Sequence, residues 1–545
     1  MRRFAAALLI TCLAAETILA AEPTVDFLVE RSDTLIGLSN NVLVSPKAWR
    51  EVAQLNRLPN PNRIVPGQVL KIPTRLMRTK LVDARLVSAV GDVRVNDAAA
   101  ADGSPVAEGQ SVQTGPASSA VIALADGSRI RLPPSSLAQV VASRQYGDRG
   151  NPAAATQPSG GWFAGTLRVL RGSVEVVATK VFRAKPLEVV TPTAVVGVRG
   201  TQYRVSLDDG ANDRTRGEVI EGSVRFDTAR ANAGAEVPAG YGALADASGA
   251  PPAPVKLLGA PDLTPVPARF ERPLVRFALP SETTPLHVQV ASDAAFDKIV
   301  SDERVAAGGE VRIAGLDDAQ WYLRARRVDA QSLEGFDATR SFVLKARPEP
   351  PVYRAPRSDA KQPVGNVEFA WAPNAEAQQV HLQIAEDEAF ARIVEQRDGL
   401  TSPALKAELK QPGVYYWRVA SVRASGDQGP FGDPQRFELR PFPEPPTVGP
   451  ASGGIGYRFA WGGRPQDRQQ VELASDAEFT QIVAKDELTA PEWLLANPPR
   501  GGRYYFRYRS IEPDGYVSPY SATLIVDVPR DWSILLLLLP ALLLL

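Results

Sequence analysis

Apolar and polar residues alternate in short runs along most of the chain, and glycine or proline closes many of these runs. Ile130 and Leu132, for example, alternate with Arg129 and Arg131, which predicts a strand with one buried face and one wet face. Asp126-Gly127, just before this run, is a strong local signal for a hairpin. Together with a length of 545 residues, the pattern predicts a mainly β, multidomain protein.

Residues 27–73 carry the clearest helical signals of the chain. After a short strand at 27–29, Ser32-Asp33-Thr34 offers side-chain oxygens suited to the N-cap of a helix over 35–40. Ser45-Pro46 starts a second helix, because a capping side chain is followed by proline at the first helical position. The run 65–73 returns as a strand, so the order predicts a small βααβ module at about 24–74.

This segment resembles the LysM module, a βααβ unit that binds N-acetylglucosamine polymers such as peptidoglycan. The resemblance is carried by Asp33-Thr34-Leu35, Leu38, Leu55-Asn56, Asn62-Arg63-Ile64 and the run 66–73, while Ser32 stands where the family usually has glycine. It implies a glycan-binding site between two loops, formed by Ser32, Asp33, Thr34, Leu35, Asn62 and Ile64. The alternative is that Asp33 and Thr34 only cap a helix and Asn62 only makes a turn, and both roles are compatible.

The pattern of residues 83–247 predicts short strands joined by tight turns. One strand–Gly–strand unit occurs at 169–176, again at 219–226, and in a shorter form at 90–95. Such repetition favours a rolled sheet or stacked β-turns over an active site.

This region resembles the FecR domain, a β-rich extracytoplasmic module of bacterial envelope proteins. The matching pieces are Gly91-Asp92-Val93, Asp126-Gly127-Ser128, Gly172-Ser173-Val174, Thr191-Pro192, Val198-Arg199-Gly200-Thr201, Glu221-Gly222-Ser223-Val224 and Pro238-Ala239-Gly240. The resemblance implies an envelope-protein partner for residues 83–247. We expect no cytoplasmic helical anti-sigma segment ahead of the domain, which puts a role in sigma-factor control in doubt.

A proline-rich linker is predicted at 248–268, and a triple repeat follows it at 269–347, 361–441 and 453–529. Matching units are Val275-Arg276-Phe277-Ala278-Leu279, Val367-Glu368-Phe369-Ala370-Trp371 and Tyr457-Arg458-Phe459-Ala460-Trp461. A spacing near 90 residues suits one seven-stranded β-sandwich per repeat. The repeats resemble fibronectin type III modules, although the first has leucine where the other two have tryptophan.

His287 and His381 are the only histidines, and they occupy the same position in two repeats, where the third has Gln470. This distribution favours surface strand residues over a general base or a metal ligand, either of which needs partners. The only cysteine, Cys12, lies within residues 1–21, whose two arginines, apolar run and small residues predict a signal peptide. We therefore expect no catalytic residue, no metal and no cofactor.

Charge and the chain ends narrow the range of partners. Lys plus Arg and Asp plus Glu both number 61, so no bulk positive charge favours nucleic acid. Residues 532–545 form an uncharged, leucine-rich tail that is shorter than the roughly 20 residues of a membrane helix, which predicts membrane contact without a span. A lipid on Cys12 is the alternative anchor.

These observations predict an exported, non-enzymatic protein of the periplasm or cell envelope. Its βααβ module would bind peptidoglycan, and the FecR-like domain and the sandwiches would form a scaffold or a partner-binding surface. The alternative hypothesis is a periplasmic signal-transduction component that relays an envelope cue through the FecR-like domain.

Overall fold

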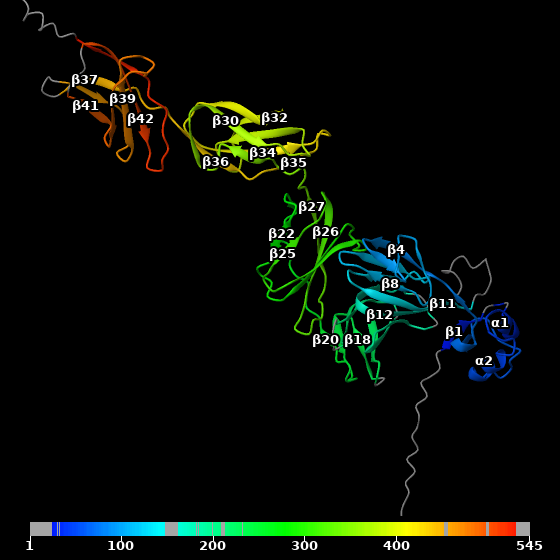
Figure 1. The fold of residues 1–545 in the computed structure, drawn as a ribbon. Helices are drawn as coiled ribbons and strands as arrows, with labels where there is room; N and C mark the ends of the chain where they lie inside the picture. Colours follow the sequence, from blue (N-terminus) through cyan, green and yellow to red (C-terminus); the bar gives the residue numbers. More distant parts are fainter. Residues whose placement is uncertain are drawn as a thin grey trace, which may run out of the picture. The chain divides into compact units, whose positions relative to one another are not determined.

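The computed structural model describes residues 24–529, except 30, 32, 148–161, 181–182, 184, 199, 209–212, 231–232, 452–455 and 497–500. The predicted signal peptide, Cys12 and the tail at 532–545 lie outside this range. The chain divides between Leu344 and Lys345 into two compact units, and strands dominate both (Figure 1). The prediction of a mainly β, multidomain protein is confirmed. In the part of the chain that is described, no helix has the length and apolar character needed to cross a bilayer.

The N-terminal module has the predicted βααβ order. It consists of β1 (Thr24–Leu28), α1 (Leu35–Asn41), α2 (Trp49–Leu55) and β2 (Val69–Pro73), followed by the 3₁₀ turn η1 (Thr74–Leu76). β1 and β2 pair antiparallel, and the two helices pack on them around Phe27, Leu38 and Ile72. The second helix begins three residues later than the Ser45-Pro46 signal predicts, at Trp49, with no side-chain cap.

The module packs against the domain that follows it. Phe27 lies 5.8 Å from the ring of Trp162, centroid to centroid, and Trp162 and Tyr146 are partly buried against the core of the module. A Cβ atom added to Gly147 would lie 2.8 Å from Met77 and 2.9 Å from Val42, so the approach is close. The LysM-like module is therefore docked by apolar contact.

Eighteen strands form the second domain, and their hydrogen-bonded path closes on itself. They are β3 (Thr79–Leu81), β4 (Ala84–Val90), β5 (Val93–Val95), β6 (Ala98–Ala99), β7 (Pro105–Val106), β8 (Ser111–Thr114), β9 (Ser119–Ala123), β10 (Arg129–Leu132), β11 (Leu137–Tyr146), β12 (Trp162–Val177), β13 (Leu187–Val190), β14 (Ala194–Val198), β15 (Gln202–Leu207), β16 (Thr215–Glu221), β17 (Ser223–Thr228), β18 (Gly234–Pro238), β19 (Tyr241–Ala245) and β20 (Val255–Lys256). The expected rolled sheet is thus present.

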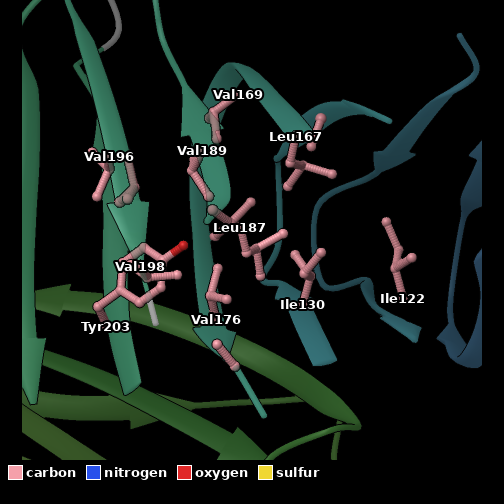
Figure 2. Close-up of a cluster of buried hydrophobic side chains, with 14 of the residues drawn as sticks. Ile122, Ile130, Leu167, Val169, Val176, Leu187, Val189, Val196, Val198 and Tyr203 are labelled. Carbon is pink, nitrogen blue, oxygen red and sulfur yellow. The ribbon is translucent and has the colours of Figure 1, made fainter. Parts of the chain in front are cut away.

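One aliphatic core fills this rolled sheet. Figure 2 shows side chains such as Ile130, Val176 and Val196 gathered in it from strands distant in sequence. The recurring glycine of the strand–Gly–strand unit bends the chain beside this core. Gly172 and Gly222 have φ of 72° and 84°, and a Cβ atom on either would come within 2.7 Å of a neighbouring side chain. The sequence repeat therefore reflects a backbone requirement.

The proline-rich segment after this domain is packed onto the domains that it joins. Val255–Lys256 pairs with β19, and Leu257, Leu263 and Val266 are buried. Apolar side chains at intervals among the prolines hold the segment in place, so its composition alone gave an incomplete description of it.

The first repeat belongs to the same compact unit as the FecR-like domain. Its strands are β21 (Arg269–Phe270), β22 (Val275–Ala278), β23 (Leu286–Ala291), β24 (Ile299–Val305), β25 (Glu310–Ile313), β26 (Ala319–Arg327) and β27 (Ala338–Leu344). They form a five-stranded sheet in the order β21-β27-β26-β23-β24 and a two-stranded sheet, β22-β25. Seven strands agree with the prediction, and Leu279 is buried where the other repeats have tryptophan.

The second and third repeats form the other unit. The strands of repeat 2 are β28 (Val352–Ala355), β29 (Ala360–Pro363), β30 (Gly365–Ala372), β31 (Gln379–Ala385), β32 (Ile393–Leu400), β33 (Ala404–Leu409), β34 (Gly413–Val422), β35 (Gln428–Phe431) and β36 (Gln435–Arg440). Those of repeat 3 are β37 (Thr447–Pro450), β38 (Tyr457–Ala460), β39 (Arg468–Ala474), β40 (Ile482–Leu488), β41 (Glu492–Leu495), β42 (Gly502–Ile511) and β43 (Leu524–Val528). Repeat 3 has the predicted seven strands, whereas repeat 2 has nine, because β29 pairs with β36 and β35 pairs with β34 in addition to strands that match those of repeat 3. Each is a sandwich with an aromatic core that contains the predicted tryptophan, Trp371 or Trp461.

Candidate glycan-binding site

Two backbone hydrogen bonds bring the predicted loops of the LysM-like module together. Val29, just before the first loop, donates its N–H to the carbonyl of Gln68 at 2.9 Å, and its own carbonyl accepts from the N–H of Gly67 at 2.8 Å. Because Val29 precedes the first loop and Gly67 and Gln68 follow shortly after residues 61–65, the beginning of the first loop lies near the end of the second. The βααβ topology thus produces the paired-loop arrangement that the resemblance implies.

The first loop ends in a helix cap. Thr34 is exposed, and its Oγ1 accepts a hydrogen bond from the N–H of Gly37 at 3.0 Å, so the capping role is real. Asp33 is half-buried, whereas the side chain of Leu35 is buried in the core and supports the loop from beneath. Of the residues expected to contact glycan, Leu35 therefore presents no surface, and Ser32 lies outside the described residues.

The second loop is a turn that leaves polar groups exposed. The N–H of Asn62 donates to Oδ1 of Asn60 at 3.0 Å, while the Asn62 side chain is exposed. Ile64 is half-buried and packs against the core of the module. Asn62 and the exposed side of Ile64 are placed to present an amide and an apolar surface together.

Sequence reasoning missed four exposed apolar side chains around these loops. Leu28 and Val69 are 55% and 53% exposed and lie opposite each other in the β1–β2 pair. Ile36, 55% exposed, follows the first loop, and Val65, 52% exposed, ends the second. The signal was present, because Leu28 and Val69 alternate with buried neighbours on an otherwise polar face. Apolar contact of this kind suits the ring face and the acetamido methyl of a sugar.

A shallow pocket on α2 extends this surface. It is lined by Trp49, Arg50, Ala53, Gln54, Arg57, Leu58 and Pro61, the last of which belongs to the second loop. The guanidinium of Arg50 lies 5.5 Å from the centre of the Trp49 ring. Residues 24–78 carry eight Lys or Arg against four Asp or Glu, so this module is basic although the whole chain is neutral.

Both histidines are buried, which corrects the expectation of surface residues. His287 contacts carboxylates through both ring nitrogens, at 2.7 Å from Asp302 and 2.9 Å from Glu334. His381 lies 3.0 Å from Oε1 of Gln428, and Phe431 packs against its ring. The physical reason is that the outer sheet face of each repeat is covered, by another domain in repeat 1 and by the repeat's own strand β35 in repeat 2. Among the described residues, no group of three or more His, Cys, Asp or Glu is arranged to hold a metal ion.

Comparison with protein families identifies two segments of the chain. Residues 28–73 match the LysM domain, and residues 110–225 match the FecR protein family. The recognition of both from sequence motifs is confirmed.

Solved structures show similarity at low identity. A protein assigned as an anti-sigma factor from Parabacteroides distasonis is 14% identical, over 27% of this chain and 59% of that one, with a TM-score of 0.20. This chain therefore spans less than two thirds of its length. The FN1–FN3 domains of chicken CNTN1 are 13% identical over 47% of this chain and 98% of that one, with a TM-score of 0.21. The fibronectin(III)-like modules of Clostridium thermocellum CbhA are 12% identical over 33% and 94%, with a TM-score of 0.21. No functional conclusion follows from likenesses of this size.

Proposed function

We propose that this protein is an exported, non-enzymatic envelope protein that binds peptidoglycan through residues 24–74. The observation that carries the proposal is the LysM match at 28–73, combined with two loops, the first beginning near the point where the second ends, that include Thr34, Asn62 and Ile64. Hydroxyl and amide groups beside apolar side chains are the mixture that sugar recognition requires. The FecR-like domain and the sandwiches then form the body of a scaffold at the wall.

The basic character of the module supports the same target. Peptidoglycan carries carboxylates on its peptide stems, and a positive surface raises the local concentration of an anionic polymer. A shallow groove buries little area, so each contact is weak. Retention on the wall then comes from many glycan strands near one protein.

Signal transduction is the second candidate, favoured by the FecR match at 110–225. In that case the FecR-like domain relays an envelope cue to a partner protein while the LysM-like module holds it at the wall. Crosslinking in intact cells from residues of the FecR-like domain separates the two: capture of a membrane regulator favours relay, and capture of wall-assembly proteins favours the scaffold.

Co-sedimentation of the full mature chain with purified sacculi tests wall binding. The full chain is the right material, because an isolated module would expose the surface of Phe27 that Trp162 covers. We expect the protein to sediment with sacculi and to be released by soluble N-acetylglucosamine oligosaccharides. A chain that stays in the supernatant would overturn the proposal.

A further inference from the structure

A row of alternating charges crosses the outer face of the FecR-like sheet. Arg131 of β10 lies opposite Glu175 of β12, Glu175 opposite Arg204 of β15, and Arg204 opposite Glu218 of β16. Their neighbours along each strand, such as Ile130 and Val174, belong to the core, so the row faces away from it. This face was expected to be wet, yet Glu175, Arg204 and Glu218 are buried. Something covers it.

The cover is the outer face of the β23–β26 sheet of repeat 1. Arg324 and Arg326 of β26 both reach Glu175, with N–O distances of 3.2 and 3.5 Å. Arg204 reaches in the other direction and donates to the carbonyls of Glu334 and Gly335 at 3.1 and 2.7 Å. The two domains thus exchange charged side chains across one buried interface.

Three acids of repeat 1 face arginines of the FecR-like domain. Asp297 lies 2.7 Å from Arg131 and also pairs with Arg129. Asp337 lies 3.3 Å from Arg204, and the carboxylate of Glu334 is 3.8 Å from the same guanidinium. We name Asp297, Glu334 and Asp337 the acidic triplet.

Repeats 2 and 3 lack the acidic triplet although they share the surrounding framework. Phe296, Phe390 and Phe479 are equivalent, and each lies under an arginine, at 4.5, 3.9 and 3.8 Å from the ring centre. The residue after each phenylalanine is Asp297 in repeat 1, but Ala391 and Thr480 in the others.

The positions equivalent to Glu334 and Asp337 in repeats 2 and 3 can be found from a β-bridge that all three repeats contain. Glu334 pairs with Val328 as Gln428 pairs with Val422 and Val517 with Ile511. The residues three positions after Glu334, Gln428 and Val517 are therefore equivalent as well. They are Asp337, Phe431 and Tyr520.

The residue at the last of these positions decides what contacts the arginine that lies over the phenylalanine of each repeat. In repeat 2, the ring of Phe431 lies 4.2 Å from the guanidinium of Arg418, which is therefore held between two aromatic rings. In repeat 3, Tyr520 closes on Arg507 at 3.9 Å in the same way. In repeat 1 the second ring is absent and Arg324 pairs with Glu175 of the neighbouring domain.

We infer that the outer face of β10, β12, β15 and β16 is a receptor surface for a β-sandwich sheet that carries the acidic triplet, and that the triplet selects repeat 1 over repeats 2 and 3. Charge complementarity chiefly determines which surfaces pair, because burying a charge against a surface without an opposite charge is costly. This face of the FecR-like domain is consequently occupied within the chain. An outside protein binds elsewhere on the domain, or displaces repeat 1.

A thiol placed under repeat 1 reports whether the interface is closed. Ser119 is buried on the outer side of β9, where its hydroxyl donates to the carbonyl of Ile299 at 3.0 Å. In the full chain with Cys12→Ser, Ser119→Cys supplies the sole thiol, and its rate of reaction with a maleimide measures opening. We expect slow labelling of this reporter protein.

The decisive variant gives repeat 1 the residues of repeat 2: Asp297→Ala, Glu334→Gln and Asp337→Phe together. We expect labelling to accelerate at least about tenfold, because opening exposes the thiol while each domain keeps its own core. The matched control is Glu310→Gln, an acid on the other sheet of repeat 1 that pairs with Arg312, and its rate should stay unchanged.

Circular dichroism checks folding in each case. Should the triple variant not fold, Asp297→Ala alone carries the test, with a smaller acceleration expected. An unchanged rate in a folded triple or single variant, or an equal acceleration in Glu310→Gln, would overturn the inference.

Discussion

The buried carboxyl of Glu218 makes the interface between the FecR-like domain and repeat 1 less stable as pH rises from mildly acidic to neutral. Burial raises the pKa of Glu218 to about 7; Arg204 and Arg216 oppose the rise, and Glu334 adds to it. One oxygen of Glu218 accepts the N–H of Glu334 at 3.3 Å, so the residue lies at the contact itself. Ionising this carboxyl in the folded protein is unfavourable.

The direction of the pH effect on stability follows from the number of protons that the folded and unfolded states bind. A carboxyl whose pKa is higher folded than unfolded binds more protons in the folded state, so stability falls as pH rises between the two values. With an ordinary value of 4.5 and a folded value of about 7, the loss between about pH 5 and about pH 8.5 is on the order of 2–3 kcal/mol. His287 acts in the same direction, because Glu334 and Asp302 outweigh burial and raise its pKa.

Other carboxyls act in the opposite direction, but at lower pH. Burial opposes ionisation of Glu175, yet Arg324, Arg326 and Arg131 lower its pKa to about 2. The pKa of Asp337 is also lowered, mainly by Arg326 against the effect of burial. Their contributions to stability are complete above the ordinary carboxyl range and are lost only in acid. Maximal stability of this unit is therefore expected in mildly acidic solution.

Calorimetric unfolding of the full chain across this range is the assay. The transition that contains repeat 1 should move down by a few degrees between about pH 5 and about pH 8.5. Glu218→Gln should remove most of that slope, leaving the part due to His287. Glu221→Gln is the control, since Glu221 ends the same strand in an exposed pair with Lys180. An undiminished slope in Glu218→Gln, or stability that rises with pH, would show that Glu218 does not carry the effect.

Three further outcomes are expected. Thr34→Ala should lower the free energy of unfolding of the LysM-like module by about 1 kcal/mol in urea titration, because the cap to Gly37 is lost, whereas Thr34→Ser should retain it; equal losses would contradict the capping role. Trp162→Ala should destabilise the same module by up to about 3 kcal/mol, because Phe27 loses the ring that covers it. Amide hydrogen exchange of β1 measures this loss, and unchanged exchange would show that docking is weak. Trp417→Ala should cost about 3–5 kcal/mol and unfold repeat 2 first, since this side chain is fully buried against Phe369; proteolysis that begins in repeat 3 instead would contradict this.

Local signals in the sequence predict much of the fold. The cap at Thr34 and the hairpin signal at Asp126-Gly127 act through residues only a few positions away. The glycines at 172 and 222 are readable because their positive φ is a local backbone property. The triple repeat is equally readable, because each sandwich buries its own aromatic core. Ser45-Pro46 misplaces a helix start by three residues, since the first turn after it does not continue as an α-helix until Trp49.

Contacts between domains are the part that the sequence conceals. Alternation at Arg129–Leu132 shows that two strand faces differ, but a covered charged face and a wet one have the same pattern. His287 looks like a surface residue until Glu334 and Asp302 are placed against it. In the candidate glycan-binding site, Leu35 and Ile36 are adjacent apolar residues, and only the helix phase decides that the first is buried and the second exposed.

Wall binding by the paired loops of the LysM-like module can be measured as the affinity of loop variants for sacculi. Ile36→Glu and Val65→Glu together place charge on two exposed side chains beside the loops without touching the core. Val483→Glu is the matched control, an exposed apolar residue in repeat 3. We predict that the double variant loses at least about tenfold in sedimentation affinity, because the sugar face loses its apolar contact, while the control binds as the wild type does. Equal binding by the folded double variant and the control would show that the wall is not bound at these loops.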